Sequence, residues 1–156
     1  MAQKKPLVLN SGQIEQLQST DYIANNDIPQ LTNGNAGSIV ICTAVYASGA
    51  NTVDKAKANA VGTTNVIGLV YDATIVAAAS GGVLMDGILS ATTGQWDAVA
   101  GTTGGLTRDT IYFLSSATAG LLTATAPTSV GEFVVSVGIA ISTTELKIEI
   151  QPRIKL

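Results

Sequence analysis

The sequence predicts an all-β protein: a compact β-sandwich or barrel-like domain, β-tulip or jelly-roll-like, that follows an extended N-terminal arm. Apolar residues occupy 46% of the 156 positions but aromatic residues only 4%, so most of the apolar content is small or β-branched. Such residues suit a pleated sheet better than a helix. Short apolar runs separated by turn-forming residues, and a period-two pattern near the C-terminus, predict the same fold class.

The first 36 residues differ from the rest, and we assign residues 1–36 to the arm and residues 37–156 to the β-domain. Two short apolar runs flank Asn10-Ser11-Gly12, whose residue types favour a turn, so a small hairpin is expected there. The stretch that follows, up to Gly37, is polar, Asn-rich and without periodicity, and it contains Pro29. It predicts an extended linker that is buried on a neighbouring molecule.

From Gly37 onward the sequence predicts a succession of strands. The continuous apolar run SIVICTAVYA, residues 38–47, is typical of a strand covered on both faces. The segment NTVDKAKANAVG has helix-favouring residues but is too short for more than one helical turn. The segment GQWDAVAGTTGG, residues 94–105, is expected to be a loop. Further strands are predicted within NVIGLVYDA, TIVAAAS, VLMDGILSA, TIYFL and GLLTATA.

The C-terminal segment carries the clearest pattern. Residues 133–141 and 145–150 alternate in polarity on either side of a short turn, which predicts an antiparallel hairpin with one buried face. At about 1.5–3 kcal/mol per buried side chain, this face would contribute on the order of 10–20 kcal/mol before chain entropy is subtracted. Its predicted members are Phe133, Val135, Val137, Ile139, Ile141, Leu146, Ile148 and Ile150.

The residue inventory excludes several kinds of active site. The chain has no His and one Cys, which excludes Ser/His/Asp and Cys/His catalytic groups, His-ligated metals and thiolate metal sites. Cys42 lies inside the apolar run of residues 38–47 and is expected to be a buried, reduced and inert thiol. We therefore expect no catalytic residues, no cofactor, no metal and no enzymatic activity.

Composition also bears on partners. No basic run exceeds Lys4-Lys5 and no aromatic residues interleave with basic ones, so no nucleic-acid partner is expected. The longest uncharged apolar run is shorter than the roughly 18 residues that a spanning helix needs, so no membrane partner is expected. Only three apolar residues follow the two lysines, which argues against a signal peptide and for synthesis in the cytoplasm. A charged fraction of 12% favours a surface that is partly covered in an assembly.

Two isolated features leave alternatives open. A carboxylate pair among Asp72, Asp86, Asp97 and Asp109 could form a glycosidase-like site or a calcium site, but the positions of these residues favour surface turns. Trp96 is either a packing residue at one end of the sandwich or a platform on which a ligand stacks. The Gly-rich GTTGGLT leads into a predicted strand, not into the helix of a phosphate-binding P-loop, and is interpreted as a turn.

Three stretches resemble virion proteins of tailed bacteriophages. The N-terminal KPLVLNSGQIEQLQSTDYI resembles the opening segment of many such proteins. The stretch from GGLTRDTIYFL to LKIEIQP is similar to a module common in them, although this chain has Arg108-Asp109 where members usually have Pro-Gly. The middle, from GSIVICTAVY to VIGLVYDA, is similar to small head-decoration domains. The same segments also occur in tail-fibre and tail-tip proteins.

The resemblance implies a capsid decoration (cement) protein on the outer capsid surface of the virion, made in the host cytoplasm. It implies two partners: the major capsid protein, whose neighbouring subunits the protein would bridge, and other copies of itself in a homotrimer that stabilises the shell. The alternative is a tail-fibre, tail-tip or adhesin component that binds the host surface or another tail protein. We expect the partner-binding residues to lie in the arm: Lys4, Lys5, Leu7, Val8, Leu9, Ile14 and Leu17.

Overall fold

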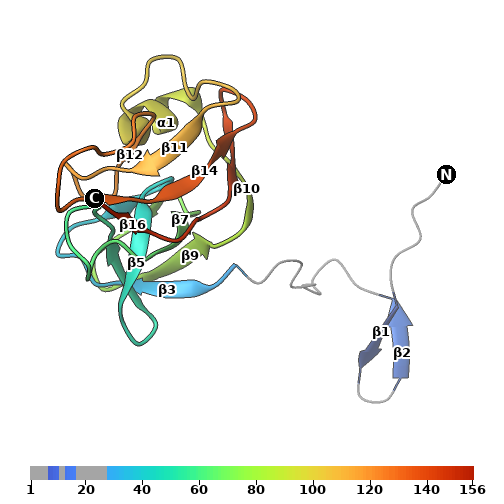
Figure 1. Cartoon of the computed structure of the whole chain (residues 1–156). Coiled ribbons are helices and arrows are strands. Elements are labelled where there is room, and N and C mark those ends of the chain that lie inside the picture. The colour runs from blue at the N-terminus through green and yellow to red at the C-terminus, as the bar shows by residue number, and fades with distance from the viewer. Residues whose placement is uncertain (1–6, 11–12, 17–27) are drawn as a thin grey trace.

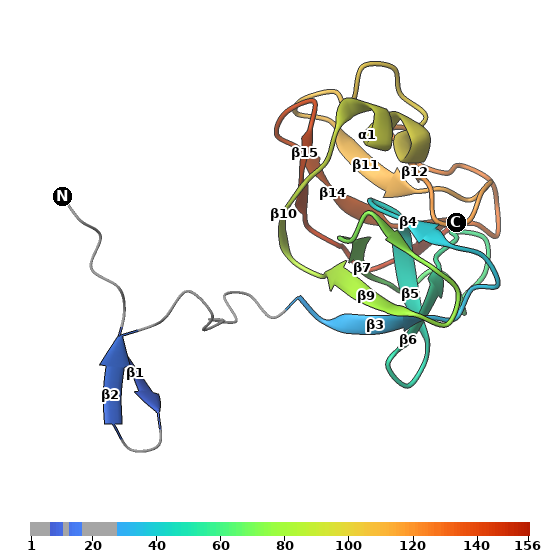
Figure 2. The same cartoon turned by 180° about the vertical axis from the view of Figure 1, so that it is seen from behind.

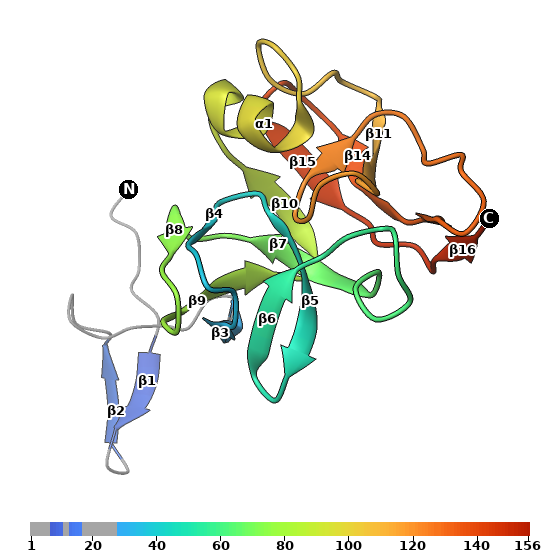
Figure 3. The same ribbon diagram turned by 90° about the vertical axis from the view of Figure 1, so that its left-hand side faces the viewer.

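The computed structural model describes residues 7–10, 13–16 and 28–156 (Figure 1). It confirms the all-β prediction, because the described residues form sixteen short strands and one helix. The body from residue 28 onward consists of a small closed barrel and a five-stranded sheet. The helix, α1, lies at the end of the body away from barrel strands β3 and β6 (Figures 1 and 3).

The barrel closes in the order β3-β6-β5-β7-β9. Strand β3 pairs parallel with β6 and antiparallel with β9, and every other neighbouring pair is antiparallel. Its interior is filled by Val45, Val53, Val70 and Val83, together with Ile39 and Ile75. The last two residues are paired between the short strands β4 (Ile39–Val40) and β8 (Thr74–Ile75). The barrel strands are β3 (Gln30–Asn33), β5 (Ala44–Gly49), β6 (Thr52–Lys55), β7 (Val66–Val70) and β9 (Ser80–Leu84).

The five-stranded sheet is antiparallel and has the order β10-β15-β14-β11-β12. Its inner face contributes to the larger core, in which Trp96, Tyr112 and Leu146 are fully buried. A separate pair of short strands, β13 (Phe133–Val134) and β16 (Ile154–Lys155), holds the C-terminal end. The sheet strands are β10 (Gly87–Ser90), β11 (Ile111–Leu114), β12 (Leu122–Thr123), β14 (Ser136–Ala140) and β15 (Glu145–Ile148).

The prediction of a loop at residues 94–105 is wrong for the first half of this segment, because α1 spans Thr93–Ala100. Thr92 accepts a hydrogen bond from the Gln95 backbone, and the Gln95 side chain accepts one from the Thr92 backbone, which completes a capping box. Gly101 ends the helix with φ 64°, in the left-handed region that glycine adopts without strain. The T-x-x-Q spacing and the terminal glycine were both present in the sequence as helix signals.

The prediction of a single strand at residues 38–47 is also wrong, because a turn divides this apolar run into β4 and β5. Cys42 has φ 68°, and Thr43 donates a backbone hydrogen bond to the Val40 carbonyl at 3.3 Å, which closes the turn. Every residue from 39 to 45 except Val40 and Ile41 is buried, so the apolar content reflects burial and not a continuous strand.

The C-terminal hairpin forms from β14 and β15, but the alternation does not run through β14 unbroken. Phe113 pairs with Ser136 and Tyr112 pairs with Gly138, so Val137 is an extra residue in a β-bulge. Beyond the bulge the inward positions shift by one residue: Ala140 is buried, whereas Ile139 is half-buried and Ile141 is exposed. The prediction that Ile139 and Ile141 share the buried face of the hairpin is therefore wrong.

The segment assigned to the arm contains more structure than a linker. Strand β3 lies within residues 1–36, yet it pairs on both sides inside the barrel. An antiparallel hairpin of β1 (Leu7–Asn10) and β2 (Gln13–Gln16) lies where the turn chemistry places one. Residues 17–27, between the hairpin and the barrel, are outside the described residues.

Candidate interaction surfaces

The β1–β2 hairpin contains four of the seven residues expected to bind a partner. Leu7, Val8 and Leu9 lie in β1, and Leu9 is opposite Ile14 of β2 in the register. Lys4, Lys5 and Leu17 are outside the described residues. In the described part of the chain β1 and β2 pair only with each other. An isolated two-stranded hairpin is at best marginally stable in water, so a further contact would stabilise this one.

A second surface is the outer face of the five-stranded sheet, opposite its core-facing side. The register aligns Ile88, Lys147, Ile139 and Ile111 in one row across β10, β15, β14 and β11. Ile88 is 53% exposed, Ile111 46% and Ile141, just beyond β14, 39%. We call Ile88, Ile111, Ile139 and Ile141 the isoleucine face. The isoleucine face was not predicted from the sequence, because the bulge at Val137 determines on which side of the sheet Ile139 and Ile141 lie.

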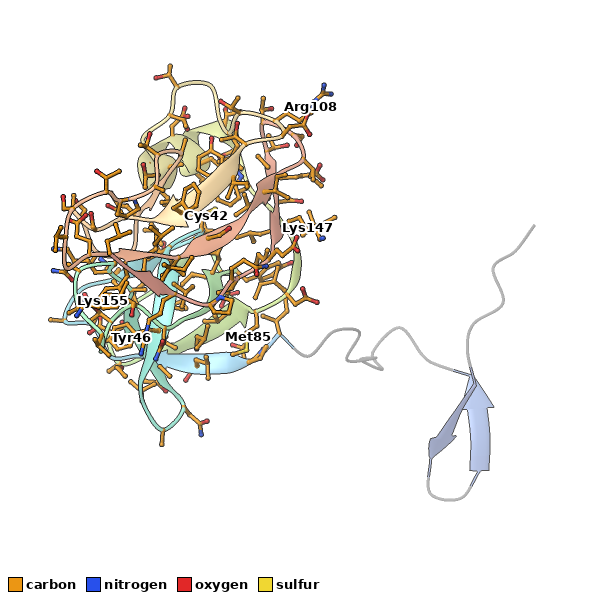
Figure 4. All side chains as sticks on the ribbon, viewed as in Figure 1. Cys42, Tyr46, Met85, Arg108, Lys147 and Lys155 are labelled. Carbon is orange, nitrogen blue, oxygen red and sulfur yellow. The ribbon has the colours of Figure 1, made fainter. Side chains whose placement is uncertain are left out.

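Exposed charges lie within and beside the isoleucine face. Lys147 Nζ lies 3.2 Å from Glu149 Oε2, and Arg108 Nε lies 3.4 Å from Asp109 Oδ2. Both pairs are more than half exposed, and exposed pairs of this kind contribute only about 0–1 kcal/mol to stability. Figure 4 shows Lys147 projecting from the body on this side. These charged groups are therefore accessible to a partner.

A hollow of about 200 Å³ opens on the isoleucine face beside β14. Gly138 is among its lining residues, and an added Cβ at this position would lie 2.2 Å from the Lys147 carbonyl oxygen. The lining is mainly apolar, and its size suits a protruding aliphatic side chain of a partner. The lining residues are Ile111, Ser136, Gly138, Ile139, Glu149 and Gln151.

The four carboxylates considered for chemistry are held separately. Asp72 Oδ2 accepts a hydrogen bond from the Gly82 backbone at 2.8 Å. Asp109 is in a left-handed turn with φ 61°, and Asp86 is exposed ahead of β10. The positions of these three agree with the turn interpretation, whereas Asp97 lies within α1. The four carboxylates thus lie in four different segments of the described body.

Asp97 organises the loop that follows α1. Its Oδ1 accepts hydrogen bonds from Thr102 Oγ1 and the Gly105 backbone, each at 2.8 Å, and its Oδ2 accepts one from the Gly104 backbone at 3.0 Å. The Gly105 amide, and then the Thr102 hydroxyl, lower the pKa of this carboxyl, because hydrogen bonds to the charged form stabilise it. The Gly-rich segment is thus a carboxylate-anchored turn.

Cys42 and Trp96 are both core residues. The Cys42 side chain is fully buried, and burial raises the pKa of its thiol to about 12, which agrees with the prediction of an inert thiol. Trp96 is also fully buried, and its Nε1 donates to the Thr144 carbonyl at 2.9 Å. The packing interpretation of Trp96 is confirmed, because a stacking platform requires access that this ring lacks.

Within the described part of the chain, no group of three or more His, Cys, Asp or Glu side chains is arranged to hold a metal ion. Among these residues there is also no helix with the length and apolar character needed to cross a membrane. Comparison with known proteins found no family model, no curated protein and no solved structure that matches the chain.

Proposed function

We propose that the chain is a structural virion protein: a capsid decoration protein that binds the outer capsid surface as an oligomer, a homotrimer by the resemblance, and stabilises the shell by bridging neighbouring subunits of the major capsid protein. The observation that carries the proposal is the β1–β2 hairpin ahead of a closed barrel. The resemblance of the N-terminal, middle and C-terminal stretches to virion proteins of tailed bacteriophages supports the same assignment.

The hairpin is suited to strand addition. Each of its strands has one partner among the described residues, so each leaves an outer edge with unpaired backbone groups. Pairing of such an edge with an exposed strand of another protein supplies main-chain hydrogen bonds and a defined register. In the proposed complex the hairpin binds a shell subunit in this way, and the barrel, which has no free edge of its own, stays intact.

Bridging explains how small contacts would stabilise a large shell. Each copy adds interface area across the seam between two subunits, so their separation requires that this contact be broken as well. When copies are joined to one another, the second and third contacts form at a high effective concentration, and three weak contacts act as one strong one. Two of the carboxylates support a structural role, because Asp72 and Asp97 accept backbone hydrogen bonds that hold separate parts of the body.

The first test is a copy count. Quantitative mass spectrometry of purified particles should find this chain in many copies, in fixed proportion to the major capsid protein. Particles that lack it should lose integrity at a lower temperature. Only a few copies per particle would contradict the proposal and would favour the alternative of a tail-fibre or tail-tip component.

The second test concerns the hairpin. Removal of residues 1–20 should leave the thermal unfolding of the body unchanged, because all the core residues that the structure describes come after residue 28. The truncated protein should no longer co-sediment with shells purified without this protein. A finer pair of full-length variants is Leu9→Asp, expected to weaken binding, and Gln13→Asp as its matched control on the partner strand. Undiminished binding of the truncated protein would move the contact to the body.

A further inference from the structure

The residues near Leu156 form a third exposed surface. Strand β16 pairs with β13, and Leu156 exchanges backbone hydrogen bonds with the adjoining loop, to Glu132 and from Gly131, each at 3.0 Å. Arg153 donates to the Val61 carbonyl at 3.1 Å, and its guanidinium lies 5.9 Å from the centre of the Phe133 ring. These contacts bring the 58–65 loop, the 128–132 loop and β16 together.

Four apolar side chains of this region are exposed. Val130, in the turn ahead of β13, is 95% exposed, and Ile154, which pairs with Val134 of β13, is 63% exposed. Val61, held by Arg153, and Leu156 are the other two. Exposed apolar groups gathered at one place mark interaction sites more often than singly scattered ones do. We call Val61, Val130, Ile154 and Leu156 the C-terminal corner.

The C-terminal corner and the isoleucine face have opposite charge. Lys57 is close to the corner, because the Phe133 backbone donates to the Ala58 carbonyl at 2.9 Å. The side chains around the corner are three cations, Lys57, Arg153 and Lys155, against one carboxylate, Glu132. Those around the isoleucine face are four carboxylates, Asp86, Asp109, Glu145 and Glu149, against two cations, Arg108 beside the face and Lys147 within it.

The C-terminal corner lies across the body from the end of the isoleucine face that β10 and β15 form. Figures 1 and 2, which view the molecule from the front and from behind, both place β16 and the C-terminus across the body from β10 and β15. Figure 4 likewise shows Lys155 on the side away from Lys147. A single copy therefore cannot bring its own corner onto Ile88, which lies on β10.

We propose that copies of this chain associate head to tail, with the C-terminal corner of one copy packed on the isoleucine face of the next. Contact between two identical surfaces would oppose like charges, whereas contact between the two different surfaces pairs cations with carboxylates and apolar groups with apolar groups. Such a heterologous contact repeats around a ring when the rotation between copies closes. The inference rests on the proposed function for the existence of an oligomer but not for binding to a shell.

The proposal is tested on the full-length protein by light scattering after size exclusion and by sedimentation. Wild type should have a mass above that of a monomer, and its association should weaken as salt rises. Val130→Asp damages only the corner and Ile88→Asp only the isoleucine face, so each should raise the dissociation constant roughly tenfold or more and yield monomers. Val76→Asp is the matched control, since Val76 is 56% exposed outside both surfaces, and it should remain associated.

The decisive measurement mixes the two monomeric variants. Val130→Asp retains an intact isoleucine face and Ile88→Asp an intact corner, so the mixture should form a one-to-one dimer and nothing larger. A mixture that stays monomeric, or a single variant that keeps the wild-type mass, would overturn the proposal. Thermal unfolding of each variant confirms that it is folded, and Ile111→Asp replaces Ile88→Asp if the edge strand does not tolerate the charge. A monomeric wild type that still binds shells would reject this contact and leave the proposed function standing.

Discussion

Asn33 Nδ2 donates to the carbonyl oxygen of Ile75 at 2.8 Å, across 42 positions of the sequence. The same amide group donates to the Gly37 carbonyl at 2.9 Å, and Asn33 Oδ1 accepts from the Asn35 backbone at 2.8 Å. The side chain is only 1% exposed. It therefore ties the end of β3 to β8 and to the following turn inside the barrel wall, where water cannot replace a lost partner.

Asn33→Asp should destabilise the protein by about 3 kcal/mol or more, because a buried carboxylate would then face two carbonyl oxygens in place of a donor. The loss should shrink as the pH falls, since burial and the carbonyl oxygens raise the pKa of the new carboxyl and its protonated form can donate again. Urea unfolding of the variant across a pH series measures both effects. Asn59→Asp, at an exposed position, is the control and should change stability by less than about 0.5 kcal/mol.

Two glycines give a matched pair of substitutions with opposite expected signs. Gly138→Ala places a Cβ 2.2 Å from the backbone oxygen of Lys147, so β14 and β15 must separate and the sheet should lose several kcal/mol or fail to form. Gly94→Ala in α1 has nothing within 4 Å of the new Cβ and should stabilise by about 0.4–1 kcal/mol. The thermal unfolding midpoint of each variant, compared with that of the wild type, measures both effects. A tolerated Gly138→Ala would contradict the observed strand register.

The Cys42 thiol should be unreactive toward maleimide or a disulfide reagent at pH 8 while the protein is folded, and fully reactive in denaturant. Burial keeps the reagent away from the sulfur, and a pKa near 12 keeps the thiol protonated at this pH. Because the folded-state pKa is raised, the free energy of unfolding should fall as the pH rises above 9.0, where the unfolded chain ionises and the folded one does not. Thr103→Cys, at an exposed position, is the positive control. Stoichiometric labelling of the native wild type would count against the buried turn.

Asp97 should give the loop after α1 an acid-sensitive structure. Its pKa is lowered by hydrogen bonds from Gly105, Thr102 and Gly104, so its contribution is complete above the usual Asp value of about 3.9 and is lost as the pH falls through the lower folded-state value. The amide resonances of Gly104 and Gly105 should titrate with a midpoint below 3.9. In the Asp97→Asn variant they should not titrate in this range. A midpoint at or above the usual value would show that the carboxylate does not hold the loop.

Residues 133–148 show how far sequence reasoning reaches in this fold. Alternation located the β14–β15 hairpin and the burial of Phe133, Val135 and Val137, because polarity with period two is a local property. It failed at Ile139 and Ile141, because the bulge at Val137 depends on the register with β11, about 25 residues earlier. The isoleucine face therefore could not be found from local pattern.

The sequence predicted that this part of the chain is β-structure, but not that β3 closes it into a barrel. Strand β3 looked like linker because it has four residues and lies in a polar stretch, and only its pairing with β6 and β9 makes it a wall of the barrel. The turn at Cys42 was hidden for a related reason: a left-handed backbone at a buried cysteine has no signature in composition. Helix α1 is different, since its capping signals were present and were outweighed by the surrounding Gly and Thr residues.

The placement of β3 has a mechanical consequence. The chain enters the barrel through this strand, which is hydrogen-bonded to β6 on one side and β9 on the other. Tension applied to the segment ahead of Ile28 therefore loads two ladders at once, and both must be sheared before the strand can be drawn out. A tether attached in this way transmits a pulling force to the whole wall of the barrel instead of peeling one strand from an edge.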